Sequence, residues 1–467
     1  MKKRSIFLFA ALLMTGVAAY AGGLMTNTNY HIAFDRMFAR GATFDIDAAY
    51  SNPAGLAWGH EGWQLSLNFQ KPWQNRDIET TIPSYLAYPA LGYTGYDVQQ
   101  KFNGKASAPI VPALFASYKK DRWAVSTMIG IVGSGGFVKY DEGIPMFNTL
   151  VMGKLFSATN GAIRPGMYDI DSKMEGKQYI FGGQLNFTYK IADFLAAAVG
   201  MRANYYDGYN RGHVVANMQG ADLINLQLDC LQKGWGFAPI VSLDFHQGPL
   251  TIAARYEFRT KINTENDTKQ LSARIKNTDP TTAAAVPYIE GQMALAQFGD
   301  KVTPYLDGVK TRYDMPALFV AAVGYEFSPK LRASVEYHFF DDKNAKMAGD
   351  RQKELSGGTN EFLAGIEYDI NDKFTVSCGG QRTDYGLSDG YQHNTSFACD
   401  SYSFGLGGVW NINDKVRLNV SYFKTIYSDY TKEFTAEQGG YMGTGYPGKD
   451  VYSRTNDVIG IGIDYKF

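Results

Sequence analysis

The sequence predicts an all-β protein: a transmembrane antiparallel β-barrel of about 14 strands with an N-terminal plug, or hatch, inside its lumen. Three observations predict this fold. Segments of alternating polarity recur along residues 63–467, short polar turns alternate with long connections, and the chain ends on the strand-like segment 458–467, which closes with Phe467. Because side chains of a strand point alternately to two faces, each such segment has one apolar and one polar face.

The segment 331–339 illustrates the alternation. Leu331, Val335 and Phe339 fall on one face, whereas Arg332 and Glu336 fall on the other. In a soluble sandwich the apolar face would form the core; in a membrane barrel it faces lipid, and the polar face lines the lumen. Charges that recur in the middle of strands favour the barrel.

The connections between the alternating segments also follow a pattern. Short turns lie at 119–122, 191–193, 246–249, 328–330, 371–373 and 413–415. Long connections lie near 74–107, 139–175, 214–232, 266–311, 344–357, 386–400 and 434–451. Short periplasmic turns and long extracellular loops are typical of outer-membrane barrels. With an even number of strands, the chain is therefore expected to enter and leave the barrel on the periplasmic side.

The N-terminal residues predict export. Lys2, Lys3 and Arg4 precede an uncharged apolar stretch, and the small-x-small site at 19–21 ends in Ala21. We therefore expect a signal peptide over residues 1–21. Residues 22–62 show no clean alternation before the barrel, which we expect to span 63–467. A wide barrel has a lumen that is filled or open, so 22–62 is expected to be a plug, the alternative being a disordered periplasmic tail.

Composition and motifs exclude several classes of function. The net charge of −1 gives no electrostatic case for nucleic acid. The sequence contains neither Gly-x-Ser-x-Gly nor His-Glu-x-x-His, and its six His are scattered without metal-ligand spacing. We expect no enzyme activity, no metal and no cofactor. Three cysteines, an odd number, indicate small hydrophobic residues rather than a disulfide framework.

Three short motifs carry a resemblance to a known family. They are Asn52, Pro53 and Ala54 before the first strand, Gly-Trp-Gly-Phe at 234–237, and Asp-Met-Pro at 314–316. The chain resembles the FadL/TodX family of outer-membrane transporters for long-chain fatty acids and other hydrophobic compounds. The resemblance implies a 14-stranded barrel whose N-terminal hatch carries the Asn-Pro-Ala motif.

The resemblance also implies a function. The chain would take up hydrophobic molecules passively, with long-chain fatty acids as the first candidate. Capture at extracellular loops would be followed by transfer to a lumen pocket and lateral exit through a kinked third strand. The implied location is the bacterial outer membrane after cleavage near Ala21, and the implied partners are a hydrophobic ligand, outer-membrane lipid and the barrel-assembly machinery. Two alternatives stay open: a FadL-like barrel that acts as an interaction platform in protein secretion, and a hydrophilic porin.

The third strand contains the candidate lateral gate. From Trp123 it runs into Gly133, Gly135 and Gly136, and then reaches Phe137. Glycines within a strand weaken its pairing and often mark a bulge. We expect a break in pairing with the second strand here; the alternative is that the strand simply ends and enters a loop.

Two long connections are unusually apolar, and both have helix-like stretches. The candidate ligand-capture residues in them are Met218, Leu223, Leu226, Leu295 and Phe298. Such connections either pack on each other as a cap or expose a surface groove for a hydrophobic ligand, and the two possibilities are compatible.

Basic residues on the predicted polar faces have two interpretations. Arg202, Arg255 and Arg259 are candidates to meet a fatty-acid carboxylate, since a guanidinium suits a planar anion. The alternative is that they pair with other lumen charges and with the plug, because a buried charge needs a partner.

Overall fold

The computed structural model describes residues 24–107, 110–279 and 281–467, so the predicted signal peptide lies outside the described residues. The strands are β1 (Gly62–Tyr85), β2 (Tyr96–Ser107), β3 (Val111–Lys120), β4 (Trp123–Tyr140), β5 (Asp169–Ala192), β6 (Leu195–Met218), β7 (Ala221–Gln247), β8 (Leu250–Glu257), β9 (Asn263–Lys276), β10 (Tyr288–Glu290), β11 (Lys310–Arg312), β12 (Leu318–Ser328), β13 (Leu331–Phe340), β14 (Thr359–Asp369), β15 (Phe374–Asp384), β16 (Ser401–Asn411), β17 (Val416–Tyr427), β18 (Tyr430–Phe434) and β19 (Gly448–Lys466).

Helices are few and short. The α-helices are α1 (Ile32–Met37), α2 (Ala48–Ser51), α3 (Pro145–Ala158) and α4 (Gly291–Ala296). The 3₁₀-helices are η1 (Pro53–Trp58), η2 (Pro89–Leu91), η3 (Gly299–Lys301), η4 (Thr303–Tyr305), η5 (Asp342–Asn344), η6 (Ala348–Glu354), η7 (Ala436–Gln438) and η8 (Tyr441–Gly443). Within the described part of the chain, none of the helices has the length and apolar character needed to cross a membrane.

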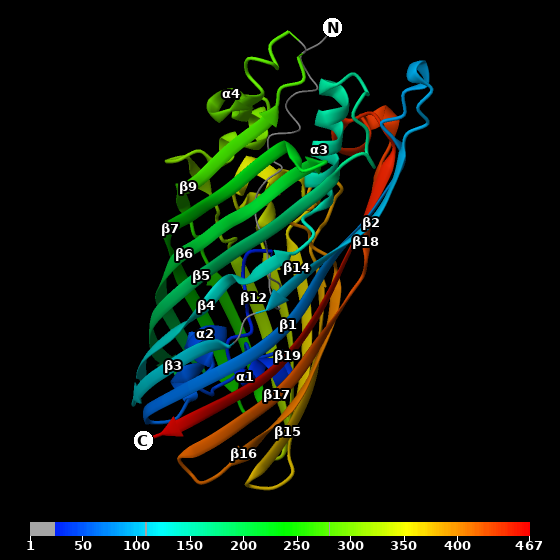
Figure 1. The fold of residues 1–467 in the computed structure, drawn as a ribbon. Coiled ribbons are helices and arrows are strands. Elements are labelled where there is room, and N and C mark those ends of the chain that lie inside the picture. Colours follow the sequence, from blue (N-terminus) through cyan, green and yellow to red (C-terminus); the bar gives the residue numbers. More distant parts are fainter. Residues whose placement is uncertain (1–23, 108–109, 280) are drawn as a thin grey trace.

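Fourteen antiparallel strands form one closed barrel (Figure 1). The pairs β2/β3, β8/β9 and β17/β18 are each two pieces of one barrel strand, and β10 and β11 are short additions that pair with β9. The first strand closes the barrel against the last, from Gln64 opposite Lys466 to Thr81 opposite Lys449. The amide of Phe467 donates to the carbonyl of Trp63 at 3.0 Å. The predicted barrel is confirmed.

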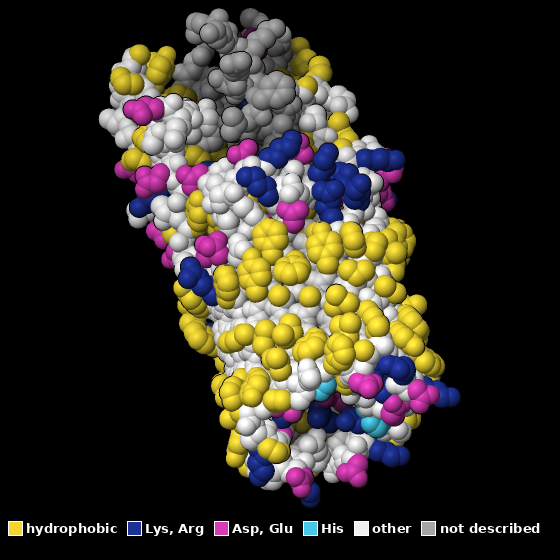
Figure 2. Space-filling view, turned by 180° about the vertical axis from the view of Figure 1, so that it is seen from behind, with side chains coloured by type: hydrophobic (Ala, Val, Ile, Leu, Met, Phe, Trp, Pro, Cys, Tyr) yellow, Lys and Arg dark blue, Asp and Glu magenta, His cyan; other side chains and the backbone are white. Residues whose placement is uncertain are grey.

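The alternation of the sequence becomes the two faces of the wall. In β5, Gln184, Asn186 and Thr188 are buried toward the lumen, whereas Leu185 and Phe187 are exposed on the outside. On the face that Figure 2 shows, the exposed apolar side chains form a belt across the barrel, with charged side chains beyond both of its edges. This is the pattern that a barrel surrounded by hydrocarbon requires.

The two ends of the barrel differ. One end, the turn end, carries the short turns between β5 and β6, β7 and β8, β12 and β13, β14 and β15, and β16 and β17. The other end, the loop end, carries the long connections, the helix α3 and the helix α4 (Figure 1).

Two predicted long connections are wrong. Residues 74–107 are mostly strand, because β1 continues to Tyr85 and β2 begins at Tyr96. Residues 214–232 form no loop with helix-like stretches but the outer part of the β6–β7 hairpin, which turns at Gln219 and Gly220. The hydrogen-bonded ladder continues beyond the belt, where the outward side chains are no longer regularly apolar. The periodic signal therefore ends before the strands do.

The N-terminal segment 24–58 lies inside the barrel, near the turn end (Figure 1). Helix α1 contacts β14, β15, β16, β17 and β19, and η1 contacts β5, β6 and β7. Arg36 forms an ion pair with Glu367 and donates to the Ser377 hydroxyl at 2.7 Å. Polar side chains of the lumen thus bind this segment directly.

Candidate functional site

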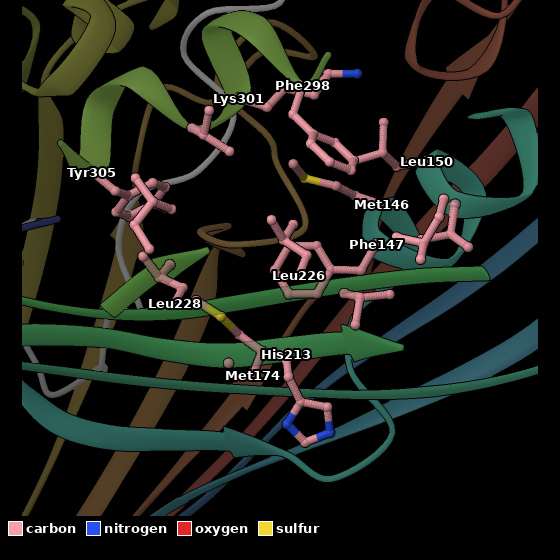
Figure 3. A pocket seen from close by; sticks show the side chains of 16 residues that line it. Met146, Phe147, Leu150, Met174, His213, Leu226, Leu228, Phe298, Lys301 and Tyr305 are labelled. Carbon is pink, nitrogen blue, oxygen red and sulfur yellow. The ribbon is translucent and has the colours of Figure 1, made fainter. Parts of the chain in front are cut away.

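An apolar cleft lies at the loop end, between α3, the β6–β7 hairpin and residues 298–305 (Figure 3). The space between these elements is about 640 Å³ in total, and this total includes open solvent. The cleft is lined by Met146, Phe147, Leu150, Val151, Met174, Gly212, His213, Val214, Ile224, Leu226, Leu228, Leu271, Phe298, Lys301, Val302 and Tyr305. A mostly apolar lining with few polar groups is typical of small-molecule sites.

Helix α3 forms one wall of the cleft. Ile144 is extended, and Pro145 occupies the first turn, where its fixed φ suits a helix start and its missing N–H costs no bond. The helix is apolar on nearly all sides, which is typical of a buried helix. Met146, Phe147 and Leu150 project from it toward the cleft (Figure 3).

The hairpin forms the opposite wall. Leu226 lies opposite Val214 in the β6–β7 register, and Leu228 lies opposite Gly212. The β7 strand also pairs with β9, where Leu228 lies opposite Leu271. These side chains are therefore held by a continuous ladder of backbone hydrogen bonds.

Two basic side chains line this otherwise apolar cleft. His213 faces Asp171, with 3.4 Å between Nε2 and Oδ1. Burial lowers the pKa of Lys301, and the charge of Lys154 lowers it further. An anionic group within the cleft would act in the opposite direction, because an opposite charge favours the ammonium form.

The structure brings most of the predicted capture residues together. Leu226 and Phe298 line the cleft itself. Leu223 and Leu295 are buried in the same apolar cluster, and Met218 packs against that cluster. Sequence reasoning missed α3, although Pro145 followed by an apolar run was the available signal.

Among the described residues, the wall of the barrel has a break in its pairing beside β4. β4 pairs with β3 as far as Ile129 opposite Leu114, and its pairing with β2 resumes at Phe137 opposite Ser107. The register between β4 and β5 also shifts on both sides of Gly133. Gly133 lies in this stretch and still pairs with Ile180 of β5. The candidates Gly135 and Gly136 lie where the neighbouring strand includes residues 108 and 109, which are outside the described residues.

The N-terminal segment occupies the inner side of this break. The Asn27 amide donates to the Val132 carbonyl at 3.1 Å, and the Asn27 side chain donates to the Ile131 carbonyl at 3.2 Å. The Tyr30 hydroxyl donates to the Val132 carbonyl at 3.0 Å. Backbone groups that lack a neighbouring strand are thereby satisfied by residues from the lumen.

The residues of the Asn-Pro-Ala motif are buried and form hydrogen bonds with β5 and β7. The Asn52 side chain donates to Asp244 at 3.0 Å, and the Ala54 amide donates to the Ser242 hydroxyl at 3.1 Å. The carbonyl of Pro53 accepts from the Thr188 hydroxyl at 2.8 Å. Pro53 also begins η1, where its fixed φ is suitable.

The three candidate arginines already have protein partners. Arg202 is fully buried and forms an ion pair with Glu257. Arg255 donates to the carbonyl of Tyr50, and its guanidinium lies 4.5 Å from the centre of that ring. Arg259 donates to the Asn344 carbonyl on the outer part of the wall.

The described residues contain no group of three or more His, Cys, Asp or Glu side chains that is arranged to hold a metal ion. Cys230, Cys378 and Cys399 are free thiols.

Comparisons with known proteins identify the fold. No protein-family model matches the chain, and no curated protein matches its sequence. Among solved structures, a Pseudomonas aeruginosa FadL homologue superposes with a TM-score of 0.64 at 13% identity, covering 96% of this chain and 100% of that one.

Two toluene transporters are also similar. TodX of P. putida has a TM-score of 0.54 at 11% identity and covers 92% of this chain and 97% of its own. TbuX of Ralstonia pickettii has a TM-score of 0.53 at 13% identity and covers 94% of this chain and 98% of its own. The chain therefore has the fold of FadL and TodX, the proteins whose family its sequence resembles.

Proposed function

We propose that this protein is an outer-membrane transporter for the passive uptake of hydrophobic molecules, with long-chain fatty acids as its principal ligands. The apolar belt and the shared fold support the location. The similar structures described as toluene transporters support a hydrophobic ligand. In this orientation the loop end faces the outside and the turn end faces the periplasm.

The apolar cleft is the observation that carries the proposal. Its walls come from α3 and from the β6–β7 hairpin, so an alkyl chain would lie between Phe147 and Leu226. Lys301 is the group that would meet a carboxylate, because it lines the cleft and a nearby anion favours the ammonium form of a lysine. Toluene-like ligands would use the same apolar walls without Lys301.

We infer the later steps from the wall and the N-terminal segment. Residues 24–58 act as a plug that keeps the lumen closed to ions. The break beside Gly133, Gly135 and Gly136 is the lateral exit, bordered by Phe137. A ligand that leaves there enters the membrane without crossing water, which suits an apolar molecule.

Binding of a chain-length series tests the ligand. Each buried CH₂ contributes about 0.8 kcal/mol, so affinity should rise by up to about fourfold per carbon from about eight to about sixteen carbons. Binding to the purified protein can be followed by calorimetry. A flat response over this range, or a preference for sugars, would refute a fatty-acid ligand.

A variant of Lys301 tests the carboxylate site separately. Lys301→Met should weaken fatty-acid binding by about ten- to a hundredfold, the usual contribution of a charged hydrogen bond, and leave the fatty alcohol of equal length unaffected. Lys269→Met is the matched control, since Lys269 is exposed and pairs with Asp267 at 2.6 Å away from the cleft. Equal loss for acid and alcohol would show that Lys301 only supports the fold.

A further inference from the structure

Basic side chains gather on the outer surface just beyond the apolar belt at the loop end. Figure 2 shows Lys and Arg side chains immediately beyond the belt on the face it displays. One group of them, the Asp314 cluster, surrounds a single carboxylate. Its basic members are Arg259, Lys261, Arg312, Lys343 and Lys346.

Contacts to Asp314 draw three segments of the chain together. The Asp314 side chain is fully buried and accepts from Arg312 Nε at 2.8 Å, and Arg259 Nε lies 4.0 Å from it. The Lys346 amide donates to the same carboxylate at 3.3 Å. Arg259 also donates to the carbonyl of Asn344. Residues near 259, 312 and 345 therefore form one continuous surface.

The charges of this surface do not balance. Asp314 serves two guanidinium groups, and the side chains of Lys261, Lys343 and Lys346 are exposed on the same segments of the chain. The Lys343 ammonium donates to the Ser356 carbonyl at 3.4 Å. Neighbouring acids contribute little negative charge at the surface. Asp342 is buried and accepts from the Thr359 hydroxyl, and burial raises its pKa to about 7.

Two other acids belong to the same loop. Asp341 accepts from the Asn344 side chain at 2.7 Å. Asp350 pairs with Lys353 at 2.6 Å, outside the cluster. Like charges that lie close together repel one another, so an anion that bridged these basic groups would stabilise the surface.

The depth of the cluster matches that of lipid headgroups. Phe258, which directly precedes Arg259, is exposed on the outside and packs against Tyr256, with ring centres 4.9 Å apart. Aromatic side chains of this kind mark the level at which hydrocarbon meets headgroups. Arg259 follows Phe258 in the chain, so the basic side chains begin next to these rings.

We propose that the Asp314 cluster binds the phosphate groups of a phosphorylated glycolipid in the outer leaflet. Guanidinium groups bind phosphate through paired N–H donors, and the three lysines add mobile positive charge. The inference rests on the proposed outer-membrane location, but it concerns the lipid-facing surface rather than the cleft. The bound lipid would be a structural partner and not the transported ligand.

Native mass spectrometry of the full-length protein in detergent tests the proposal, with diphosphoryl lipid A as the probe. The triple variant Lys261→Gln, Lys343→Gln, Lys346→Gln should bind it on the order of a hundredfold more weakly, since each cation contributes about a factor of five near anionic lipid. The matched control is Lys330→Gln, Lys373→Gln, Lys415→Gln, three exposed lysines at the turn end, which should bind as the unchanged protein does.

Further measurements distinguish binding of the lipid phosphates from binding of free phosphate. Monophosphoryl lipid A should bind more weakly than the diphosphoryl form, and the three Lys→Arg exchanges should preserve binding. Inorganic phosphate alone should not displace the lipid. Unchanged binding by the Gln triple, equal loss in the turn-end control, or displacement by inorganic phosphate would overturn the proposal. Binding of fatty acid to the same triple variant should be unaltered. The experiment therefore distinguishes a wrong lipid-site proposal from a wrong proposal about the transported ligand.

Discussion

Adding one methyl group at Gly133 should displace the N-terminal segment from the break in the wall. A Cβ at this position would lie 2.4 Å from the Met25 carbonyl oxygen and 2.9 Å from Ile180 Cδ1. The contact with Met25 is a contact with backbone, which cannot rotate away as a side chain end does. The segment around Asn27 must therefore move inward in Gly133→Ala.

The structure sets the magnitude of this effect. The segment is held at the break by three hydrogen bonds, two from Asn27 and one from Tyr30, together worth about 3 kcal/mol. Overpacking by one methyl group costs about 1 to 3 kcal/mol, which is comparable to the whole attachment. The docked state of the segment should weaken by a factor of about 5 to 150.

Amide hydrogen exchange measures this directly. Exchange of a peptide that covers residues 24–30 should accelerate in Gly133→Ala, and ligand uptake into liposomes should rise if the segment closes the exit. Gly130→Ala is the matched control on the same strand, because its Cβ would meet its nearest neighbour, Ala113 Cβ, at an ordinary 3.5 Å. Unchanged exchange in Gly133→Ala, or equal acceleration in both variants, would refute the reasoning.

Two further predictions concern the N-terminal segment. Deletion of residues 22–60 should raise the ion conductance of the reconstituted barrel, because the lumen loses its filling; unchanged conductance would mean that the segment does not plug the lumen. Burial raises the pKa of Asp35 in α1 well above its usual value, so the docked segment releases the proton of Asp35 at a higher pH than the free segment does. The docked state of the segment is therefore most stable below the ordinary carboxyl pKa of about 4, and its stability decreases as pH rises toward the raised pKa of Asp35. Exchange of the segment should accelerate with pH beyond its intrinsic dependence, and Asp35→Asn should abolish that excess; an identical excess in the variant would exclude Asp35 as its source.

The alternation of polar and apolar residues predicted the barrel, because an odd or even position along a strand decides which face of the wall a side chain occupies. Leu185 and Gln184 face lipid and lumen for that reason alone, and the same rule extends from β1 to β19. The short turns at the turn end could be predicted for a related reason, since each is a short polar stretch between two alternating segments.

The pairings inside the lumen could not be predicted in this way. Whether Arg202 meets Glu257, or Arg36 meets Glu367, depends on how the strands are staggered and where the N-terminal segment folds back. Neither quantity is encoded in the alternation of a single strand. Helix α3 was missed for another reason: a helix that is apolar on all sides has no amphipathic period to detect.

The two walls of the cleft differ in mechanical character. Leu226 and Leu228 stand on strands that are hydrogen-bonded to both neighbours, so they can separate only if the ladder itself breaks. Met146 and Leu150 stand on a single helix that is joined to the barrel through segments on either side of 145–158. When the cleft widens, the helix is therefore the wall that moves, because displacing it breaks side-chain contacts but no strand pairing. The rate at which a ligand enters and leaves is then a property of α3, whereas the shape that the ligand finds is a property of the hairpin.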